Sequence, residues 1–383
     1  MKKYGVVAIL VILLLGLSLL WLHMKRSPII LGFMGPLTGK YADLGVQGRN
    51  GAFLAVEDIN AEGGISGRPV VLKTEDDRGT PEGAKEAAMK LKAAGAFAIV
   101  GPMLSTSAYA IKDFIDENRL VTVSPTVSSS RFSGKKDYFF RVIIDTGVRS
   151  KGLARFALDI LDPPTKHPRL WCMIYDLDNV DYTQDFINNF SHVVEKPGDL
   201  TSCKIAFRSK EGPVPDYVFG QLEAVNPDAV VLAVSAIDGS QILNWMKTNL
   251  PHVPVFGSVW MMTEELRRRL TSIEPLEVFA EHIEPPRYTE EATRFKERFR
   301  KRFGKEANFP ALFSYFAVQV LTKALKKADG NVESLREILS SGITYYSFLV
   351  GRITIDEFGD ASHLWWIYKL ENGGLKLVHE EAY

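Results

Sequence analysis

Cysteine is almost absent from this chain, because its 383 residues include only Cys172 and Cys203. Two cysteines are too few for a small fold held together by several disulfides. They lie on separate predicted strands, and we expect two buried thiols rather than a bridge. Excess charge is absent too, since 46 basic residues balance 46 acidic ones. Nucleic-acid-binding proteins usually show a basic excess on one face, so we expect no nucleic-acid partner.

The sequence motifs of catalysis and of cofactor binding are also missing. There is no P-loop and no G-x-S-x-G elbow, and the seven histidines show no H-x-x-H or H-E-x-x-H spacing. Glycines recur every third residue from Gly45 to Gly51, which is the wrong spacing for a dinucleotide fingerprint. Asp176, Asp178 and Asp181 lack the glycine and glutamate of a calcium loop, so we interpret them as solvated loop acids. The sequence therefore predicts no enzyme, no metal and no cofactor.

One long uncharged run is present at the N-terminus, from Tyr4 to Leu22, between basic residues on both sides. A helix of that length reaches roughly 28 Å, close to the hydrocarbon thickness of a membrane. No A-x-A pattern and no cysteine follows the run. We therefore prefer an uncleaved anchor in the inner membrane to a cleaved signal peptide, which stays the alternative for residues 1–26. Both readings place the body of the protein, with 42 basic and 46 acidic residues, outside the cytoplasm.

Short apolar runs alternate with helical patterns in the body. From residue 29 to residue 123 the order is β-α-β-α-β, and the rhythm restarts after about residue 147 and continues to residue 256. Such a series is typical of parallel sheets with helices on both faces. Two further helical stretches (289–302 and 310–328) and strand-like segments at 348–378 follow. The sequence thus predicts two α/β units of similar size.

Small hydroxyl-rich loops follow two of the predicted strands, at 101–107 and at 124–130. In open α/β sheets ligands bind outside the carboxyl ends of the strands. Serine and threonine hydroxyls and the amides at a helix start suit an anion such as a carboxylate. Helix capping explains either loop taken alone. Because the two loops follow neighbouring strands, we favour ligand binding.

A family likeness is carried by GPLTG at 35–39, by GAFLAVEDINAEGGISGR at 51–68 and by GRITIDEFGD at 351–360. With these motifs the chain resembles the leucine/isoleucine/valine-binding family of periplasmic solute receptors, which are associated with ABC transporters. The likeness covers about residues 28–380. It implies two Rossmann-like lobes with parallel sheets, joined by a three-strand hinge and preceded by the N-terminal transmembrane helix.

The likeness also implies how the chain is divided between the lobes. Lobe one takes residues 28–143 plus 286–345, and lobe two takes residues 144–282 plus 348–383. The chain is expected to cross between the lobes near 142–147, 281–287 and 344–350, and the lobes to close about these crossings.

Ligand roles carry over from the family position by position. Ser105 and Ser128 match positions that hold a ligand carboxylate, and Val127 matches one whose backbone contacts the ligand amine. Tyr182 matches an aromatic residue that covers the ligand from lobe two. Tyr315 matches a tyrosine that lines the pocket, with core packing as the alternative for both tyrosines.

The chain departs from the family where the ligand amine is bound. The acidic residue expected shortly after Gly257 is replaced by Ser258 and apolar residues up to Met262, including Trp260. Asp145 is a candidate substitute from the first crossing, and Thr106 and Ser235 complete the candidate set. Burying an ammonium without a carboxylate is costly. We therefore expect a ligand that is an apolar or aromatic acid, or an amino acid held differently.

The function implied is that of an extracytoplasmic receptor that delivers a small carboxylate-bearing solute to an ABC permease. The alternative is a membrane-tethered module of the same fold that reports its ligand to a signalling partner.

Overall fold

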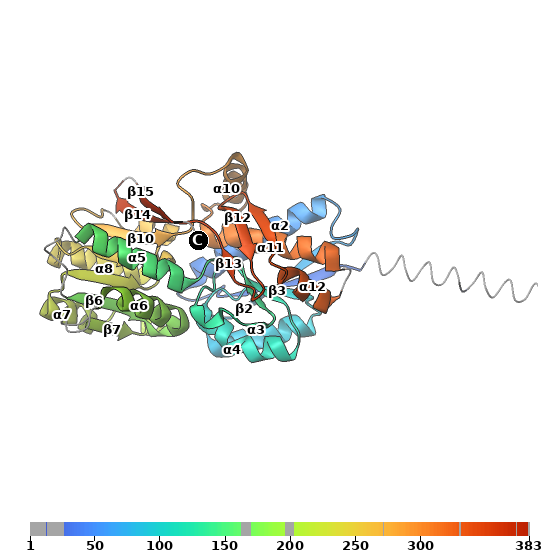
Figure 1. Ribbon diagram of the computed structural model, residues 1–383, viewed down its shortest axis with the longest axis horizontal. Coiled ribbons are helices and arrows are strands. Elements are labelled where there is room, and N and C mark those ends of the chain that lie inside the picture. Colours follow the sequence, from blue (N-terminus) through green and yellow to red (C-terminus); the bar gives the residue numbers. More distant parts are fainter. Residues whose placement is uncertain are drawn as a thin grey trace, which may run out of the picture.

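The chain forms two lobes that lie side by side in the computed structural model (Figure 1). The structure describes residues 27–161, 170–195, 203–270, 272–328, 331–372 and 374–381, together with Leu13. Within these residues, no helix has both the length and the apolar character needed to cross a membrane. The expected membrane helix at residues 4–22 lies outside the described residues apart from Leu13, so it stays a prediction.

Lobe one is built on a parallel five-stranded sheet in the order β2-β1-β3-β4-β5. The strands are β1 (Ile29–Gly35), β2 (Val70–Asp76), β3 (Ala98–Val100), β4 (Thr122–Ser124) and β5 (Phe139–Arg141). The helices are α2 (Ala42–Ala61), α3 (Pro81–Ala93), α4 (Ser105–Glu117), α10 (Glu290–Phe303), α11 (Phe309–Ala328) and α12 (Val332–Leu339). Because α2 packs on α11 while α3 packs on α4, both faces are covered, and β3 and β4 are buried throughout.

The glycines at the start of α2 serve this packing. A Cβ atom on Gly51 would lie 2.0 Å from the carbonyl oxygen of Ala311 on α11. A Cβ atom on Gly45 would lie 2.0 Å from the carbonyl oxygen of Pro36. The repeat that fails as a dinucleotide motif therefore allows α2 to approach α11 and the loop after β1.

Lobe two contains a seven-stranded sheet in the order β15-β14-β10-β9-β8-β6-β7. The strands are β6 (Trp171–Asp176), β7 (Cys203–Phe207), β8 (Ala229–Ala233), β9 (Val255–Gly257), β10 (Val278–His282), β14 (Trp365–Glu371) and β15 (Gly374–Glu381). The helices are α5 (Thr146–Leu161), α6 (Val180–Val194), α7 (Asp216–Val225), α8 (Ala236–Asn249) and α9 (Glu264–Arg269). Strands β6 to β10 are parallel and repeat the order of lobe one, and the C-terminal strands β14 and β15 add an antiparallel edge.

The third crossing differs from the prediction. A small sheet of β11 (Thr344–Ser347), β12 (Gly351–Ile355) and β13 (Ala361–Ser362) packs against lobe one, where Tyr345 contacts Phe316 of α11. The chain therefore crosses between β13 and β14, not at 344–350, and residues 348–362 belong to lobe one. The motif at 351–360 does predict a strand, but its partners β11 and β13 come from its own neighbourhood.

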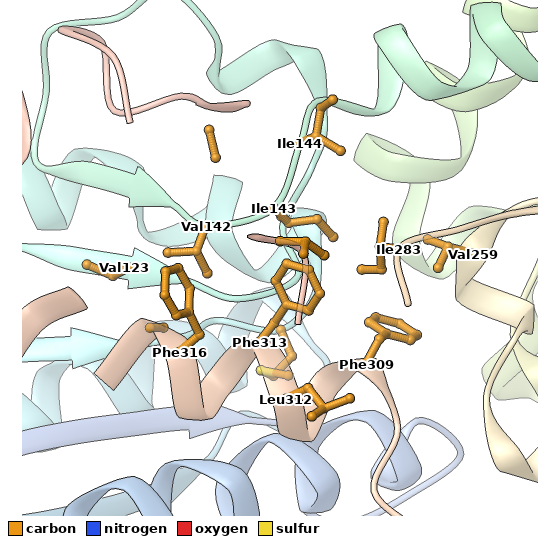
Figure 2. Close-up of a cluster of buried hydrophobic side chains, with 14 of the residues drawn as sticks. Val123, Val142, Ile143, Ile144, Val259, Ile283, Phe309, Leu312, Phe313 and Phe316 are labelled. Atoms are coloured by element: carbon orange, nitrogen blue, oxygen red, sulfur yellow. The ribbon is translucent and has the colours of Figure 1, made fainter. Parts of the chain in front are cut away.

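The hydrophobic core continues through the crossings (Figure 2). Val142, Ile143 and Ile144 of the first crossing and Ile283 of the second are completely buried. Figure 2 shows Val142, Ile143 and Ile283 beside phenylalanines of α11, among them Phe313. The hinge is thus packed like the interior of the lobes, so any closing motion must keep these contacts.

The two cysteines correct the expectation of free thiols. Cys172 on β6 and Cys203 on β7 stand opposite each other in the parallel register, with Cα atoms 4.4 Å apart. They are joined by a disulfide. The prediction was wrong because sequence alone does not show that the two strands are neighbours at the same level. A disulfide fits an oxidising, extracytoplasmic compartment.

Candidate functional site

A small pocket lies between the lobes, at the carboxyl ends of strands from both sheets. In each sheet the strand order reverses between the first and third strands, β1 and β3 or β6 and β8, and such switch points are where open α/β sheets bind ligands. The lining residues are Leu44, Met103, Leu104, Ser105, Thr126, Ser128, Ile143, Asn179, Tyr182, Val259, Trp260 and Phe309.

Lobe one contributes a helix start and hydroxyl groups. Ser105 is the first residue of α4, and Leu104 before it supplies no side-chain cap. The amide of Thr106 donates to Oδ1 of Asn179 across the cleft at 3.3 Å. Asn179 therefore occupies one of the amides at the start of α4, and the hydroxyl of Ser105 beside this helix N-terminus suits an anionic group.

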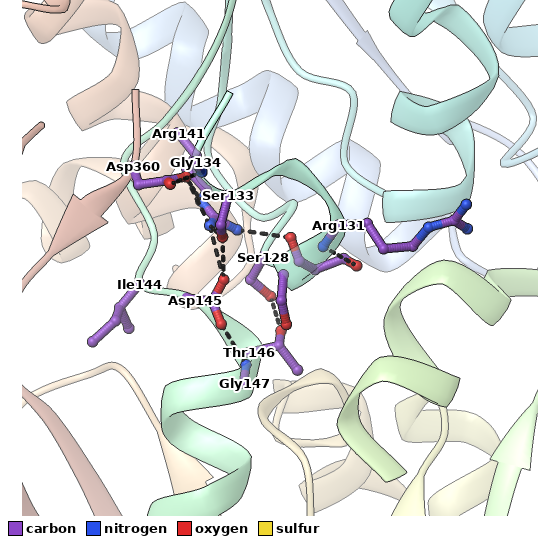
Figure 3. A network of polar contacts seen from close by, with 12 residues as sticks. Ser128, Arg131, Ser133, Gly134, Arg141, Ile144, Asp145, Thr146, Gly147 and Asp360 are labelled. Atoms are coloured by element: carbon purple, nitrogen blue, oxygen red, sulfur yellow. Dashed lines mark hydrogen bonds and ion pairs between the residues drawn. The ribbon is translucent and has the colours of Figure 1, made fainter. Parts of the chain in front are cut away.

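Ser128 supplies the second hydroxyl from lobe one, and a buried arginine donates a hydrogen bond to it. Nη2 of Arg149 donates to Oγ of Ser128 at 3.0 Å, and Oγ1 of Thr146 lies 2.6 Å from the same oxygen. A guanidinium can only donate, so the proton of Ser128 points to Thr146 or into the pocket. Figure 3 shows Ser128 and Thr146 side by side at the start of α5.

Arg149 is completely buried and pairs with the equally buried Glu281 of β10 at 2.7 Å. The amide of Val259, a lining residue, also donates to Glu281 at 3.2 Å. Burial raises the pKa of Glu281, and the charge of Arg149 opposes that shift. Sequence reasoning missed Glu281 because β10 was not predicted, and it missed Arg149 because the partner of this arginine lies 132 residues later in the chain. The one available signal was an acidic residue directly after the apolar run Val278–Ala280.

Aromatic side chains from lobe two cover the other side of the pocket. Tyr182 lies on α6, and Trp260 lies in the short 3₁₀ turn Val259–Met261 after β9. Their rings meet edge to face with centroids 5.9 Å apart, and Tyr41 of lobe one packs on Trp260 at 5.3 Å. Burial raises the pKa of Tyr182, so its hydroxyl stays protonated.

Of the nine predicted site residues, the pocket brings together Ser105, Ser128, Tyr182 and Trp260. Thr106 lies at the rim, where its hydroxyl accepts from the amide of Asp181 at 3.2 Å. Val127 is buried in the core of lobe one, and its amide donates to Ser124 rather than facing the cleft.

The three other candidates lie elsewhere. Asp145 accepts from Arg141 at 2.9 Å and from Ser133 at 2.6 Å in the polar network of the first crossing (Figure 3). Ser235 caps α8. Tyr315 donates to Asp58 at 2.7 Å in a separate groove of lobe one. Asp145 and Ser235 directly precede the helices α5 and α8, and Tyr315 lies inside α11, so the structure does not bring these three residues to the pocket.

Two of the acids at the end of β6 and in the segment after it, Asp176 and Asp181, are not the solvated loop residues that we expected. Asp176 is completely buried, and the hydroxyl of Tyr41 donates to it at 2.5 Å. Burial raises the pKa of Asp176 to about 6. Asp181 is largely buried and pairs with Arg131. The covering residues come from lobe one, far away in sequence. Within the described residues, no group of three or more His, Cys, Asp or Glu side chains could hold a metal ion.

Comparisons with known proteins agree with this architecture. Residues 28–375 match the sequence profile of a family described as periplasmic binding protein. The Leu/Ile/Val-binding protein BraC3 of Rhizobium johnstonii is 39% identical over 112 residues, which cover 29% of this chain and 30% of that protein. The chain thus matches about a third of the length of such curated relatives.

Two solved structures share the fold over most of both chains. The branched-chain amino acid transporter substrate-binding protein LivJ of Streptococcus pneumoniae, in complex with isoleucine, has a TM-score of 0.79 at 19% identity, covering 93% of this chain and 99% of its own. A Rhodopseudomonas palustris solute-binding protein of an ABC transporter, in complex with benzoate, has a TM-score of 0.78 at 17% identity, covering 93% and 97%.

Proposed function

The chain belongs to the periplasmic binding protein family, and we propose that it is an extracytoplasmic receptor that captures a small carboxylate-bearing solute for uptake by an ABC-type permease. The observation that carries this proposal is the pocket at the strand ends of both sheets, to which lobe one brings hydroxyls and a helix start and lobe two brings aromatic rings. This arrangement binds and encloses a solute. Family members are receptors and not enzymes, and binding without turnover is the activity proposed here.

The ligand proposed is an apolar or aromatic acid rather than an amino acid. Every described residue that lines the pocket is uncharged. Ser105, Ser128 and the start of α4 supply donors for a carboxylate, whereas an α-ammonium would lack an acidic partner. Glu281, the acid behind the lining, is already neutralised by Arg149. Isoleucine and benzoate both occur in structures that share this fold, so the lining, and not the fold, decides between the two classes.

Titration calorimetry of the purified protein with benzoate, phenylalanine and leucine tests the ligand class. Benzoate should bind, and the two amino acids should bind at least tenfold more weakly, because a buried ammonium without a partner costs more than 1.4 kcal/mol. The matched variant Trp260→Ala should weaken benzoate binding and leave the fold unchanged. Tight leucine binding would overturn the ligand class, and absence of binding by all small acids would overturn the receptor function.

The location at the inner membrane and the permease partner are part of the same proposal. The run at residues 4–22 is long enough to act as an uncleaved anchor. After expression with its own N-terminus, the protein should sediment with membranes, and alkaline carbonate should not release it. Recovery of a soluble protein that begins near residue 27 would instead indicate a cleaved signal peptide.

A further inference from the structure

A lysine of lobe one reaches into an acceptor cage of lobe two at the rim of the cleft. Lys40 lies in the turn just before α2. Its Nζ atom donates to the carbonyl oxygens of Ser209 at 2.7 Å and Gly212 at 2.8 Å, and to Oδ1 of Asp238 at 2.6 Å. An ammonium has three donors, so lobe two satisfies all of them.

The cage is built before the lysine arrives. Asp238, in the first turn of α8, is completely buried, and its second oxygen accepts from the hydroxyls of Ser209 at 2.5 Å and Ser235 at 2.6 Å. Both hydroxyls belong to lobe two, so they hold the carboxylate in place independently of lobe one. Ser235 therefore belongs to the cage rather than to the ligand pocket.

Neither Lys40 nor any residue of the cage lines the interlobe pocket. The lysine side chain retains only 15% of its exposure, and its partner Asp238 has none. When the lobes separate, the ion pair between the ammonium and the carboxylate is broken, and both groups become hydrated. A charge-assisted contact of this kind, made only across the cleft, adds to the stability of the closed state.

We propose that Lys40 is a positioning residue that latches the closed receptor and so sets the lifetime of every complex without choosing the ligand. This inference rests on the proposed receptor function for its ligand, but the latch itself depends only on the contact between the lobes. A contact that is present in the closed state and absent from the pocket contributes equally to all ligands. Removal of Lys40 should therefore lower the affinity for all ligands alike, whereas selectivity should depend on the aromatic residues Tyr182 and Trp260.

Other contacts between the lobes accompany this latch. Tyr41 makes one hydrogen bond to Asp176, and Thr263 makes one to Asp43 at 3.0 Å. Lys210 of lobe two donates to the carbonyl oxygen of Gly79. Arg131 of lobe one also pairs with Asp181 of lobe two, but its side chain remains 49% exposed. Ser130 of lobe one donates through its amide and its hydroxyl to Asp185 of lobe two. Lys40 is the cation whose three donors all meet acceptors of the other lobe, including a completely buried carboxylate, so its removal should have the largest effect on closure.

The decisive variant is Lys40→Met, which keeps the length of the side chain and removes the ammonium. Lys85→Met, at an exposed position of α3, is the matched control. With benzoate as the probe, Lys40→Met should weaken binding roughly tenfold to hundredfold, mainly through faster dissociation measured by stopped flow. The ratio of affinities for benzoate and a larger aromatic acid should stay within about twofold of the wild type. Lys85→Met should match the wild type throughout.

Small-angle X-ray scattering separates failure of the latch from failure of the receptor function. Without any ligand, Lys40→Met should have a larger radius of gyration than the wild type and than Lys85→Met. If the wild type binds no acid, the receptor proposal fails, while the scattering still tests the latch. Equal scattering together with an equal dissociation rate would overturn the latch, and so would a changed selectivity ratio.

The variant Asp238→Asn gives an independent test from lobe two. It removes the charge that Lys40 meets and retains the shape of the side chain. In a double-mutant cycle, combining it with Lys40→Met should weaken benzoate binding little more than either change alone. Additive effects would contradict a direct latch, and equal thermal unfolding of the variants would exclude a loss of fold.

Discussion

The two lobes share one strand order but bring different chemistry to the cleft. In lobe one, the loops after β3 and β4 present Ser105 and Ser128. In lobe two, the segments after β6 and β9 present Tyr182 and Trp260. Because the switch point fixes where the loops meet but not what they contain, one scaffold brings hydroxyl groups to the pocket and its copy brings aromatic rings.

The lobes also differ in how each buries an arginine near the first crossing. Arg141 of lobe one pairs with Asp145 and Asp360, which remain 18% and 19% exposed. Arg149 of lobe two pairs with Glu281, which has no exposure. An acid that reaches water can recover its hydration when the arginine is lost, whereas a completely buried acid cannot.

The largest expected effect is on stability, when each of these two arginines is replaced. Arg149→Met should lower the free energy of unfolding by about 3–5 kcal/mol, because Glu281 is left buried and unpaired. Arg141→Met should cost about 1–3 kcal/mol, since its two acids rehydrate. Urea unfolding of both variants measures the contrast. The double variant Arg149→Met/Glu281→Leu should recover most of the loss, and equal losses in the two single variants would contradict the comparison.

The next effect concerns the disulfide, which lies in lobe two alone. Reducing it should lower the unfolding free energy of that lobe by about 2–4 kcal/mol, because the 31-residue separation closes a sizeable loop. The described tryptophans (Trp171, Trp245, Trp260, Trp365 and Trp366) all lie in lobe two, so their fluorescence follows its unfolding. Without reductant, thiol titration of the unfolded protein should find no free thiol. Two reactive thiols would contradict the bridge.

The crossings should respond to pH differently from either lobe. Nδ1 of His282 accepts from the amide of Ile283 at 2.9 Å, and Nε2 of His363 accepts from the amide of Ile144 at 3.0 Å. Burial lowers the pKa of both histidines to about 4. Their contribution to stability is therefore complete above pH 6.5 and is lost as the pH falls toward 4. When the pH is lowered from 7.5 to 5.5, each histidine should reduce the free energy of unfolding by about 1.3 kcal/mol.

A variant is needed to isolate this effect, because buried acids act in the opposite direction. Burial raises the pKa of Asp77 to about 7 and that of Asp176 to about 6, so their contribution falls as the pH rises through those values. His363→Gln retains an acceptor for Ile144 and does not titrate. Relative to this variant, the wild type should lose about 1.3 kcal/mol between pH 7.5 and 5.5. A constant difference would show that His363 does not titrate differently on unfolding.

The smallest expected effects distinguish the residue that sets affinity at the pocket from the residue that sets ligand preference. Ser128→Ala in lobe one should weaken the binding of every carboxylate ligand by about 1 kcal/mol, or roughly fivefold. Arg149 keeps Thr146 as an acceptor in this variant. Trp260→Phe in lobe two should change the preference between small and large acids more than it changes the mean affinity. Calorimetry with benzoate and a larger aromatic acid measures both. A selectivity change in Ser128→Ala alone would reverse the assignment.

Much of the fold follows from local patterns. The β-α-β rhythm of both lobes, the strand at 203–207 and the helix that ends at residue 328 are present as predicted. The strand β10 was missed because Glu281 and His282 interrupt its apolar pattern. Their burial becomes possible only through Arg149, from 132 residues earlier in the chain, and through backbone amides within the crossing.

The candidate site was predicted only in part, for a similar reason. Ser105 and Ser128 could be found, because hydroxyls after strand ends are visible in the sequence. Asp145 and Ser235 also stand between a strand and a helix, and Tyr315 matches a family position, yet each has a partner from its own lobe or from the crossing. Local patterns do not distinguish a residue that meets a ligand from one that meets a neighbouring side chain.

The sequence by itself determined the alternation of strands and helices, the two-lobed family likeness and the serines at the strand ends, since these depend on periodicity and short motifs. The tertiary structure alone decided which acids are buried, that Cys172 meets Cys203 and that Lys40 meets Asp238. Those pairings join residues far apart in the chain, and their energies arise from desolvation and geometry that exist only once the lobes are packed together.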